Sequence, residues 1–507
     1  MKKNNLLRLS VIFGLTLILT GAIAVFSSSN KLSFDNFNLK AAIPECEYHH
    51  GYHYAEKEAT IDQPGHKEFW TCCTCQHQYI VKPNGSFIDQ DDAYMIGVID
   101  EHHIAYIPPL TSGGENGDYW TTDTFDDDFE GQPKTRIVVL AGQSNAAGVG
   151  YFDCLTQSVD AAKINEIKNG YENVLITGYS HGHYLDGYQT VYADETTATV
   201  DRVGTFGPEI GIADRLSKSF PDETIYIVKY AYGGTSLNYD LISPSARASI
   251  PEVAGLNNGR GRGWQYDDMV TCLQNLISDL YMTTDTVPSI EALMWMQGES
   301  DAVFEVSKNN YLVTFNAFMN DFKSTFAHNL SSDFALYDAE INDCGYWQYS
   351  SEINAAKRSR ADENNIILDT NSRLTTQYEP INNSADFAHY DAASYIDLGH
   401  MFADAYLAKT LRTYEQNTLE ITSPTSISMH YGQNYTISAP TVKFNNASVN
   451  AILSYYAEQT RSGNDTISYF TVNGSTFTPT KRGATNLRIT AYYNNEVRTV
   501  VVPVTIS

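Results

Sequence analysis

The chain has 507 residues, with 33 Lys and Arg against 60 Asp and Glu, which gives a formal net charge of −27 at pH 7. This length exceeds one ordinary hydrophobic core, so several domains are expected. The apolar and aromatic content argues against a disordered protein, and the acidic balance argues against a nucleic-acid partner, because like charges repel.

Residues 1–29 have the pattern of an export signal. Basic residues at the start precede an apolar run from Val11 to Phe26, and small serines follow it. That order is typical of a secretory signal peptide. The run is long for a cleaved segment and short for a spanning helix, so an uncleaved membrane anchor is the alternative. We therefore expect a protein that is secreted or held at the cell surface.

Residues 43–110 form a small segment rich in Cys and His. Cys72 and Cys75 have the spacing of a zinc knuckle, and Cys46 with His49 or His50 could complete a tetrahedral zinc site, for which we select His50. Such a zinc ion would stabilise a segment too short for a good core. A disulfide such as Cys46–Cys72 is the alternative after export. The odd total of seven cysteines gives no complete disulfide framework.

A polar linker over residues 111–133 leads into a region, residues 134–415, where apolar β-type runs alternate with helical patterns. Five runs predict buried strands over 136–141, 225–230, 290–296, 334–341 and 365–369. The helical patterns cover 209–219, 266–280, 311–326, 350–364 and 392–411. This alternation predicts a parallel sheet with helices on both faces.

Residues 418–507 are rich in Thr, Ser, Asn and Val, and Asn-Gly and Asn-Asn turns separate their short alternating runs. This pattern is typical of a small Ig-like β-sandwich. Such a module could contact a cell wall or a glycan, or it could serve as a spacer.

The motif Gly142-Gln143-Ser144-Asn145 follows directly on the first strand-type run. In an open α/β sheet, ligands bind beyond the carboxyl ends of the strands. Ser144 is therefore placed where a nucleophile could act. A serine that only caps the next helix is the alternative.

A serine nucleophile needs a base and an orienting carboxylate. Asp386 and His389 follow the last predicted strand, at the same end of the sheet as Ser144. Asp397 and His400 have the same spacing, but they lie inside a helical pattern, where His400 is expected on a helix face. We therefore predict Asp386 and His389 as the partners of Ser144.

Two more polar motifs follow predicted strands and could stabilise the oxyanion of acyl transfer. Gly233 and Gly234 permit a tight turn with exposed backbone N–H groups, and Gln297 supplies an amide side chain.

Glu299 and Asp301 could form the acid–base pair of a glycosidase. We expect instead that they hold the loops of the site by hydrogen bonds.

These motifs together resemble those of the SGNH hydrolases, and more narrowly those of carbohydrate esterase family six, the sialate O-acetylesterase and acetylxylan esterase branch. The resemblance covers about residues 134–412 and implies a three-layer α/β/α, flavodoxin-like domain. It implies Ser144 as nucleophile, His389 as general base and acid, and Asp386 as orienting carboxylate. The matching motifs are Gly142-Gln143-Ser144-Asn145, Gly207-Pro208-Glu209, Gly233-Gly234-Thr235, Gln297-Gly298-Glu299-Ser300-Asp301 and Asp386-x-x-His389.

The resemblance also implies the oxyanion donors, which are the backbone N–H groups of Ser144 and Gly234 and the side chain of Gln297. The residues that it implies as supports of the site or the substrate are Gln143, Asn145, Thr235 and Glu299. It implies no catalytic metal and no organic cofactor. Two departures, Ala146 in place of Met and His400 where arginine is common, leave the substrate preference open.

We therefore predict an exported esterase that removes acetyl groups from sialic acid or from an acetylated, xylan-like polysaccharide. A surface carbohydrate-binding or adhesion protein with an inactive hydrolase scaffold is the alternative, and the two flanking modules would suit it. A lipase or thioesterase is disfavoured by the glycine-containing motifs after the second and third strands. The stretches 151–205 and 238–265 are interpreted as loops that shape the choice of substrate.

Overall fold

The computed structural model describes residues 134–507 apart from short gaps, and four strand segments before them. The gaps cover 181–182, 200–201, 253–255, 257–259, 284–285, 328, 344, 378–385, 412, 459 and 463–464. The earlier segments form one antiparallel sheet: β1 (His50–Tyr54), β2 (Phe69–Thr71), β3 (Gln78–Tyr79) and β4 (Asp118–Thr121). The predicted export signal, Cys46, Cys72, Cys75 and the side chain of His50 lie outside the described part of the chain.

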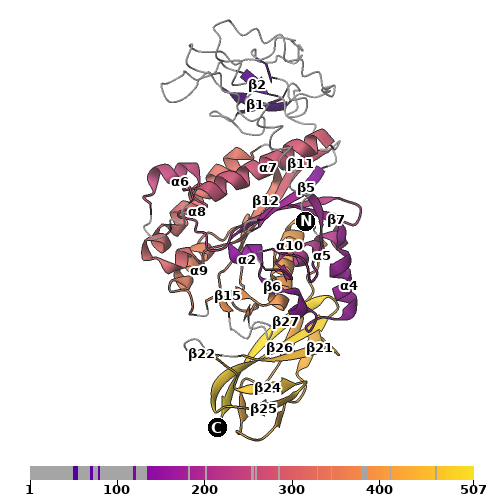
Figure 1. Ribbon diagram of the computed structural model, residues 1–507. Coiled ribbons are helices and arrows are strands. Elements are labelled where there is room, and N and C mark those ends of the chain that lie inside the picture. Colours follow the sequence, from indigo (N-terminus) through magenta and orange to yellow (C-terminus); the bar gives the residue numbers. More distant parts are fainter. Residues whose placement is uncertain are drawn as a thin grey trace, which may run out of the picture. The chain divides into compact units, whose positions relative to one another are not determined.

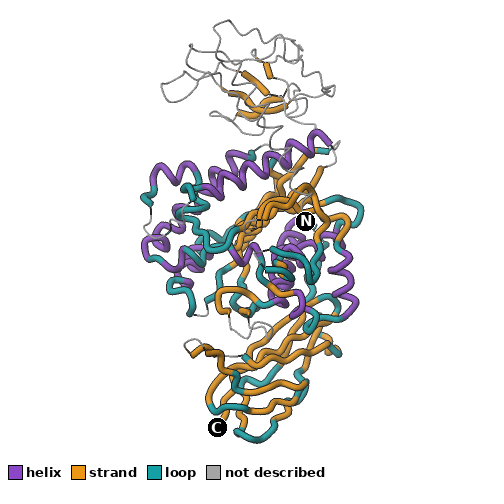
Figure 2. The backbone as a smooth tube through the Cα atoms, viewed as in Figure 1, coloured by secondary structure: helices purple, strands orange, loops and turns teal. Residues whose placement is uncertain are grey.

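A seven-stranded sheet forms the centre of the domain that begins at residue 134 (Figure 1, Figure 2). Its order is β13-β12-β11-β5-β10-β7-β8, and every neighbouring pair is parallel except β7 with the edge strand β8. The strands are β5 (Lys134–Gly142), β7 (Tyr171–Ser180), β8 (His183–Val191), β10 (Ile225–Ala231), β11 (Val287–Met296), β12 (Leu330–Ala339) and β13 (Asn365–Leu368). All five predicted strands are confirmed.

The interpretation of residues 151–205 as a loop is wrong. This stretch forms α3 (Phe152–Leu155), α4 (Ala161–Asn169), β7 and β8. β7 lies next to the edge of the sheet, where Val174 and Ile176 are buried and Glu172, Asn173 and Leu175 are less so. The strand therefore lacks the continuous apolar run that marks a central strand. In the stretch 238–265, the described residues before α7 (Trp264–Thr283) are loops and turns around the short helix α6 (Pro244–Ser249).

Helices cover both faces of the central sheet, as the alternation predicted. α7 (Trp264–Thr283) and α8 (Glu305–Thr325) lie on one side, and α5 (Glu209–Ser219) and α10 (Ala392–Thr410) lie on the other (Figure 1). α5 has the predicted bounds. The helix predicted over 350–364 ends early, as α9 (Ser350–Arg358), because a turn closed by the Asp362–Asn365 bridge leads into β13. The remaining short elements are α2 (Ser144–Ala147), β6 (Gly150–Tyr151), β9 (Thr205–Phe206), η2 (Asp301–Val303), β14 (Thr376–Gln377) and β15 (Asp386–Tyr390).

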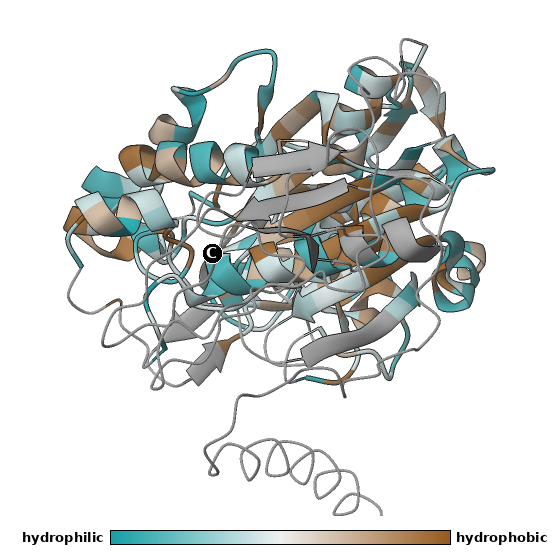
Figure 3. Cartoon of the chain, turned by 90° about the horizontal axis from the view of Figure 1, so that it is seen from above, coloured by the Kyte–Doolittle hydropathy of each residue, from teal (hydrophilic) through white to brown (hydrophobic). Residues whose placement is uncertain are grey.

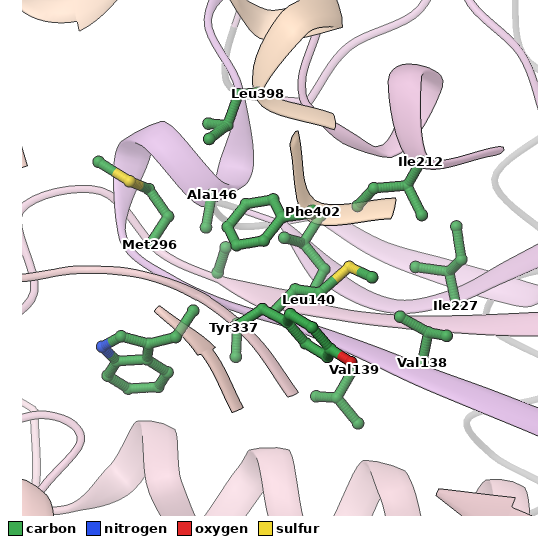
Figure 4. Packing of buried hydrophobic residues seen from close by; sticks show 14 of the residues in the cluster. Val138, Val139, Leu140, Ala146, Ile212, Ile227, Met296, Tyr337, Leu398 and Phe402 are labelled. Carbon is green, nitrogen blue, oxygen red and sulfur yellow. The ribbon is translucent and has the colours of Figure 1, made fainter. Parts of the chain in front are cut away.

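The core lies between the sheet and these helices. Residues from Ile137 to Ala141 of β5 are fully buried, and Figure 4 shows Val138, Val139 and Leu140 among side chains of neighbouring elements. In Figure 3 the apolar residues are concentrated along the central strands, and hydrophilic residues lie on the outer helices. β5 is thereby held on both sides and both faces, which makes its carboxyl end a rigid support.

The strand order places a switch point at that end of the sheet. From β5 the chain goes outward to β7 and returns to β10; it then passes to the other side of β5 to form β11, β12 and β13. β5 and β11 are therefore neighbours whose connections leave in opposite directions. In open α/β sheets, the crevice beyond such a pair is where ligands bind.

The C-terminal region consists of short strands in several small sheets, with its own core around Phe470, Phe477 and Leu487. Its two longest strands, β26 (Gly483–Tyr493) and β27 (Glu496–Ile506), form an antiparallel hairpin. The other strands are β16 (Leu419–Thr422), β17 (Ile427–Met429), β18 (Tyr435–Thr436), β19 (Thr441–Phe444), β20 (Ala447–Val449), β21 (Ile452–Ala457), β22 (Thr460–Ser462), β23 (Asp465–Ile467), β24 (Phe470–Asn473) and β25 (Thr476–Pro479). A β-rich C-terminal region is confirmed, and its Ig-like topology stays a prediction.

In the part of the chain that the structure describes, no helix combines the length and apolarity needed to cross a membrane. The described residues also contain no cluster of three or more His, Cys, Asp or Glu side chains suited to a metal ion. The zinc and disulfide alternatives for residues 43–110 concern side chains outside that part.

Candidate active site

Ser144 begins helix α2 directly beyond the carboxyl end of β5, and it is partly exposed. The turn before it depends on Gly142, whose φ is 149° and at which a Cβ atom would lie 1.9 Å from the carbonyl oxygen of Met296. β5 and β11 can approach this closely only with glycine there. The N–H of Gln143 donates to that same carbonyl oxygen at 3.1 Å. The turn therefore presents Ser144 at the switch point.

Asp386 and His389 lie on β15 (Asp386–Tyr390), which pairs with β14 (Thr376–Gln377) in a small hairpin. Nδ1 of His389 is 2.7 Å from Oδ2 of Asp386, and the N–H of Ala388 donates to Oδ1 of Asp386 at 3.0 Å. A proton on Nδ1 satisfies the bond to the carboxylate and leaves Nε2 with the lone pair that a general base needs. The structure therefore brings this predicted pair together.

Asn145 joins this hairpin to the turn that carries Ser144. Its Nδ2 donates to the carbonyl oxygen of Ala388 at 3.0 Å, and its Oδ1 accepts from the N–H of Tyr390 at 3.3 Å. One buried amide thus binds the backbone on both sides of His389. Because Ser144 is the residue next to Asn145, these bonds hold the turn that carries the serine against the strand that carries the histidine.

Burial raises the pKa of the Asp386 carboxyl, but the hydrogen bond and the charge of His389 outweigh burial, so the net pKa lies below its ordinary value. Such a group adds stability above its unfolded pKa of about 3.9, and this stability is lost as the pH falls through the folded pKa.

We expect Asp386→Asn to make the free energy of unfolding less dependent on pH below about 4. Urea unfolding of the wild type and of Asp386→Asn at several acidic pH values measures this dependence. The prediction would be contradicted if the free energy of unfolding fell equally with pH in the two proteins.

The second Asp-x-x-His pair lies elsewhere. His400 is fully buried on α10, and its Nε2 is 2.8 Å from Oδ2 of Asp214 on α5. Asp397 accepts from Nε of Arg373 at 2.8 Å rather than from His400. His400 is therefore held between two helices, away from solvent, in agreement with its predicted place on a helix face.

The turn after β10 carries the predicted glycine pair. Gly234 is exposed with φ at 74°, a conformation that favours glycine, and a Cβ there would meet nothing within 4 Å. Thr235 is fully buried, and its hydroxyl donates to the carbonyl oxygen of Tyr232 at 2.7 Å. The N–H of Tyr232 donates to the carbonyl oxygen of Gly142 at 3.3 Å. These bonds hold the exposed Gly234 turn next to the turn of Ser144.

Gln297 and Gln143 lie beneath these turns and are almost fully buried. Nε2 of Gln297 donates to Oδ2 of Asp301 at 2.6 Å and lies 3.4 Å from the carbonyl oxygen of Thr235. Oε1 of Gln143 accepts from the N–H of Ser300 at 3.2 Å. The amide nitrogen of Gln297 is thus bonded within the protein, and its role as an oxyanion donor stays a prediction.

Glu299 and Asp301 are fully buried and bind the loops of the site. Oε1 of Glu299 accepts from Nδ2 of Asn145 at 2.7 Å, and burial raises the pKa of its carboxyl. Asp301 accepts from the N–H groups of Leu237 at 2.8 Å and Asn238 at 3.2 Å, just after the glycine turn. A glycosidase pair must face its substrate, so this geometry favours the loop-holding role.

Sequence patterns did not single out Arg260, which lies near the end of β10. Its exposed guanidinium is 4.4 Å from the ring centre of Tyr232 and 4.2 Å from that of Trp264. Nε1 of Trp264 donates to Oδ1 of Asp240 at 2.8 Å, and this hydrogen bond fixes the indole ring against the domain. No motif could have revealed Arg260, because its partner Tyr232 comes from a distant segment of the chain.

One family model matches the region of the chain that carries these residues. This model, described as carbohydrate esterase, sialic acid-specific acetylesterase, matches residues 134–408, more than half of the chain. A search of curated proteins found no match.

Solved structures with a likeness include a protein from Arabidopsis thaliana (17% identity, 54% of this chain and 99% of that chain, TM-score 0.38) and NanS (16% identity, 55% and 97%, TM-score 0.39). A carbohydrate acetylesterase from Xanthomonas citri is 12% identical over 73% of this chain and 79% of that chain, with a TM-score of 0.36.

Proposed function

The chain belongs to the carbohydrate esterase family of sialic acid-specific acetylesterases, and we propose that it is an exported enzyme that removes acetyl groups from sialic acid or from an acetylated, xylan-like polysaccharide. The observation that carries this proposal is the clamp of Asn145 on the backbone around His389. It supports the proposal because it ties the turn of Ser144 to the strand of a histidine that a carboxylate holds, and acyl transfer requires these three groups together.

In this proposal the Oγ of Ser144 attacks the acetyl carbonyl carbon while Nε2 of His389 accepts the hydroxyl proton. Asp386 keeps the ring oriented and stabilises the imidazolium. The imidazolium then gives its proton to the sugar oxygen as the bond between that oxygen and the acetyl group breaks. Water, deprotonated by Nε2, attacks the acetyl ester on Ser144. Acetate leaves, and the serine oxygen regains a proton from the imidazolium.

We propose that the backbone N–H groups of Ser144 and Gly234 stabilise the negative oxygen of the tetrahedral intermediate. The exposure of Gly234 beside the serine turn supports this role. Gln297 is the third proposed donor. Its amide nitrogen has two N–H donors, of which one is bonded to Asp301 at 2.6 Å. The second donor makes only long contacts, at 3.4 Å to the carbonyl oxygen of Thr235 and to Oε1 of Gln143, and it is the one that would turn to the oxyanion.

A panel of acetylated glycans with acetate detection tests the substrate class. We expect release from O-acetylated sialic acid or from acetylated xylan oligosaccharides, and little from long-chain esters. The exposed guanidinium of Arg260 favours sialic acid, whose carboxylate it could bind, over neutral xylan. Hydrolysis of p-nitrophenyl acetate without release from any glycan would contradict the carbohydrate assignment.

We also propose that residues 1–29 direct export and that Cys46, His50, Cys72 and Cys75 bind a structural zinc ion. The basic start and apolar run support the first proposal, and the knuckle spacing supports the second. Mass spectrometry of the exported protein tests whether the signal is removed. Zinc analysis of the full chain tests the second proposal, and a Cys46–Cys72 disulfide in place of zinc would contradict it.

A further inference from the structure

The C-terminal β module, residues 418–507, is joined to the esterase domain by buried contacts that the proposed mechanism does not use. Glu496, at the start of β27, pairs with the guanidinium of Arg215 on α5, and both side chains are buried. Tyr492 and Val497, beside the tip of the β26–β27 hairpin, belong to the same apolar cluster as the central sheet. The module therefore packs directly against the esterase domain through this hairpin.

A second contact reaches the hairpin that carries the proposed catalytic pair. Arg488 lies on β26 and is 5% exposed, and its Nη1 donates to the carbonyl oxygen of Thr376 at the start of β14. The same nitrogen is 3.4 Å from Oδ2 of Asp391, the residue that caps α10. Thr376, the first residue of β14, pairs with Tyr390, the last residue of β15. Arg488 therefore contacts the open end of the hairpin on both strands, at Thr376 and at Asp391 just after Tyr390.

Arg488 is in turn oriented by its own module. Its Nη2 donates to Oε1 of Glu458 at 3.0 Å, and Oε2 of Glu458 accepts from Nδ2 of Asn486. A guanidinium is planar and presents its donors in a fixed fork, so acceptors from different elements fix its position. The buried guanidinium lies between the carboxylates of Glu458 and Asp391. Its loss would leave both negative charges without the positive charge that compensates them.

We propose that Arg488 is a positioning residue for the catalytic pair, and that the C-terminal module is thereby part of the catalytic apparatus. Asp386 and His389 lie on the strand that Arg488 supports through Thr376 and Asp391. A shift of the hairpin moves the imidazole relative to Ser144, and a misplacement of about 1 Å can cost about 10²-fold in rate. The inference rests on the proposed roles of Asp386 and His389.

Arg488→Met in the full chain tests the proposal, with Arg498→Met as the matched control. Arg498 also lies in the module, on β27, but it contacts Ser372 at 3.2 Å and Asp397 at 3.6 Å rather than the hairpin. We expect Arg488→Met to lower kcat for p-nitrophenyl acetate at least about tenfold. KM should change little, because the hairpin carries the base and not the substrate contacts. Arg498→Met should keep kcat within about twofold.

Hydrogen exchange separates positioning from general instability and needs no substrate. In Arg488→Met the amides of residues 386–391 should exchange faster, while those of β5 keep their protection. Arg488→Lys keeps the positive charge but not the planar fork of donors. The exchange rates of residues 386–391 in this variant should lie between those of the wild type and those of Arg488→Met. It replaces Arg488→Met if that variant does not fold.

Unchanged exchange of the hairpin, or an equal loss of kcat in Arg498→Met, would overturn the proposal. Failure of the wild type on every acetylated glycan would contradict the substrate assignment alone, because the exchange experiment and p-nitrophenyl acetate still report on the hairpin.

Discussion

Replacing Ser144 with alanine should lower acetate release from p-nitrophenyl acetate by about 10⁴-fold or more, a loss of at least about 5 kcal/mol of transition-state stabilisation. The hydroxyl forms the bond to the acetyl carbon, so nothing else in the site can replace it. Residual catalysis would come from the oxyanion donors and from binding. The melting temperature should stay close to that of the wild type, because Ser144 is partly exposed and outside the core.

Ser332→Ala is the matched control for this variant. Ser332 is an exposed serine on β12, so its loss should leave both activity and melting temperature unchanged. Initial rates and thermal unfolding of the two variants beside the wild type give the comparison. Full activity in Ser144→Ala would mean that another group is the nucleophile.

Two histidine substitutions should affect turnover and stability in opposite ways. His389→Ala should lower kcat by about 10³-fold or more, with little effect on the free energy of unfolding, because this side chain is partly exposed. His400→Ala should lower the free energy of unfolding by about 2 kcal/mol or more, because it removes a buried partner of Asp214 and leaves a cavity. Its kcat should stay near that of the wild type.

Each histidine variant is the control for the other, since both remove an imidazole that is bonded to an aspartate. Initial rates and urea unfolding on the same preparations measure both quantities. An equal loss of turnover in the two variants would contradict the choice of Asp386 and His389 over Asp397 and His400.

The central strands could be predicted because burial on both faces demands continuous apolar sequence. Ile137 to Ala141 form such a run and are fully buried in β5. β7 could not be predicted in this way. Near the sheet edge, its buried Val174 and Ile176 alternate with less buried residues, and this pattern is weak in a single sequence.

The residues of the site could be predicted where short motifs follow strands. The hydrogen bonds that join these residues to the rest of the protein could not. Asn145 was singled out by its place beside Ser144, whereas its partners are the backbone atoms of Ala388 and Tyr390, which no side-chain pattern reveals. Arg488 carries no motif. Its contact with Thr376 depends on how the C-terminal module packs on the esterase domain, which is a property of the tertiary structure.

Labelling with a fluorophosphonate, followed by mass spectrometry of the peptides, tests the pairing of Ser144 with His389 most directly. Phosphonylation requires a serine activated by a neighbouring base and no particular sugar. The adduct should form on Ser144 in the wild type and should form far more slowly in His389→Ala. An adduct on a different residue, or equal labelling rates in the two proteins, would contradict the account.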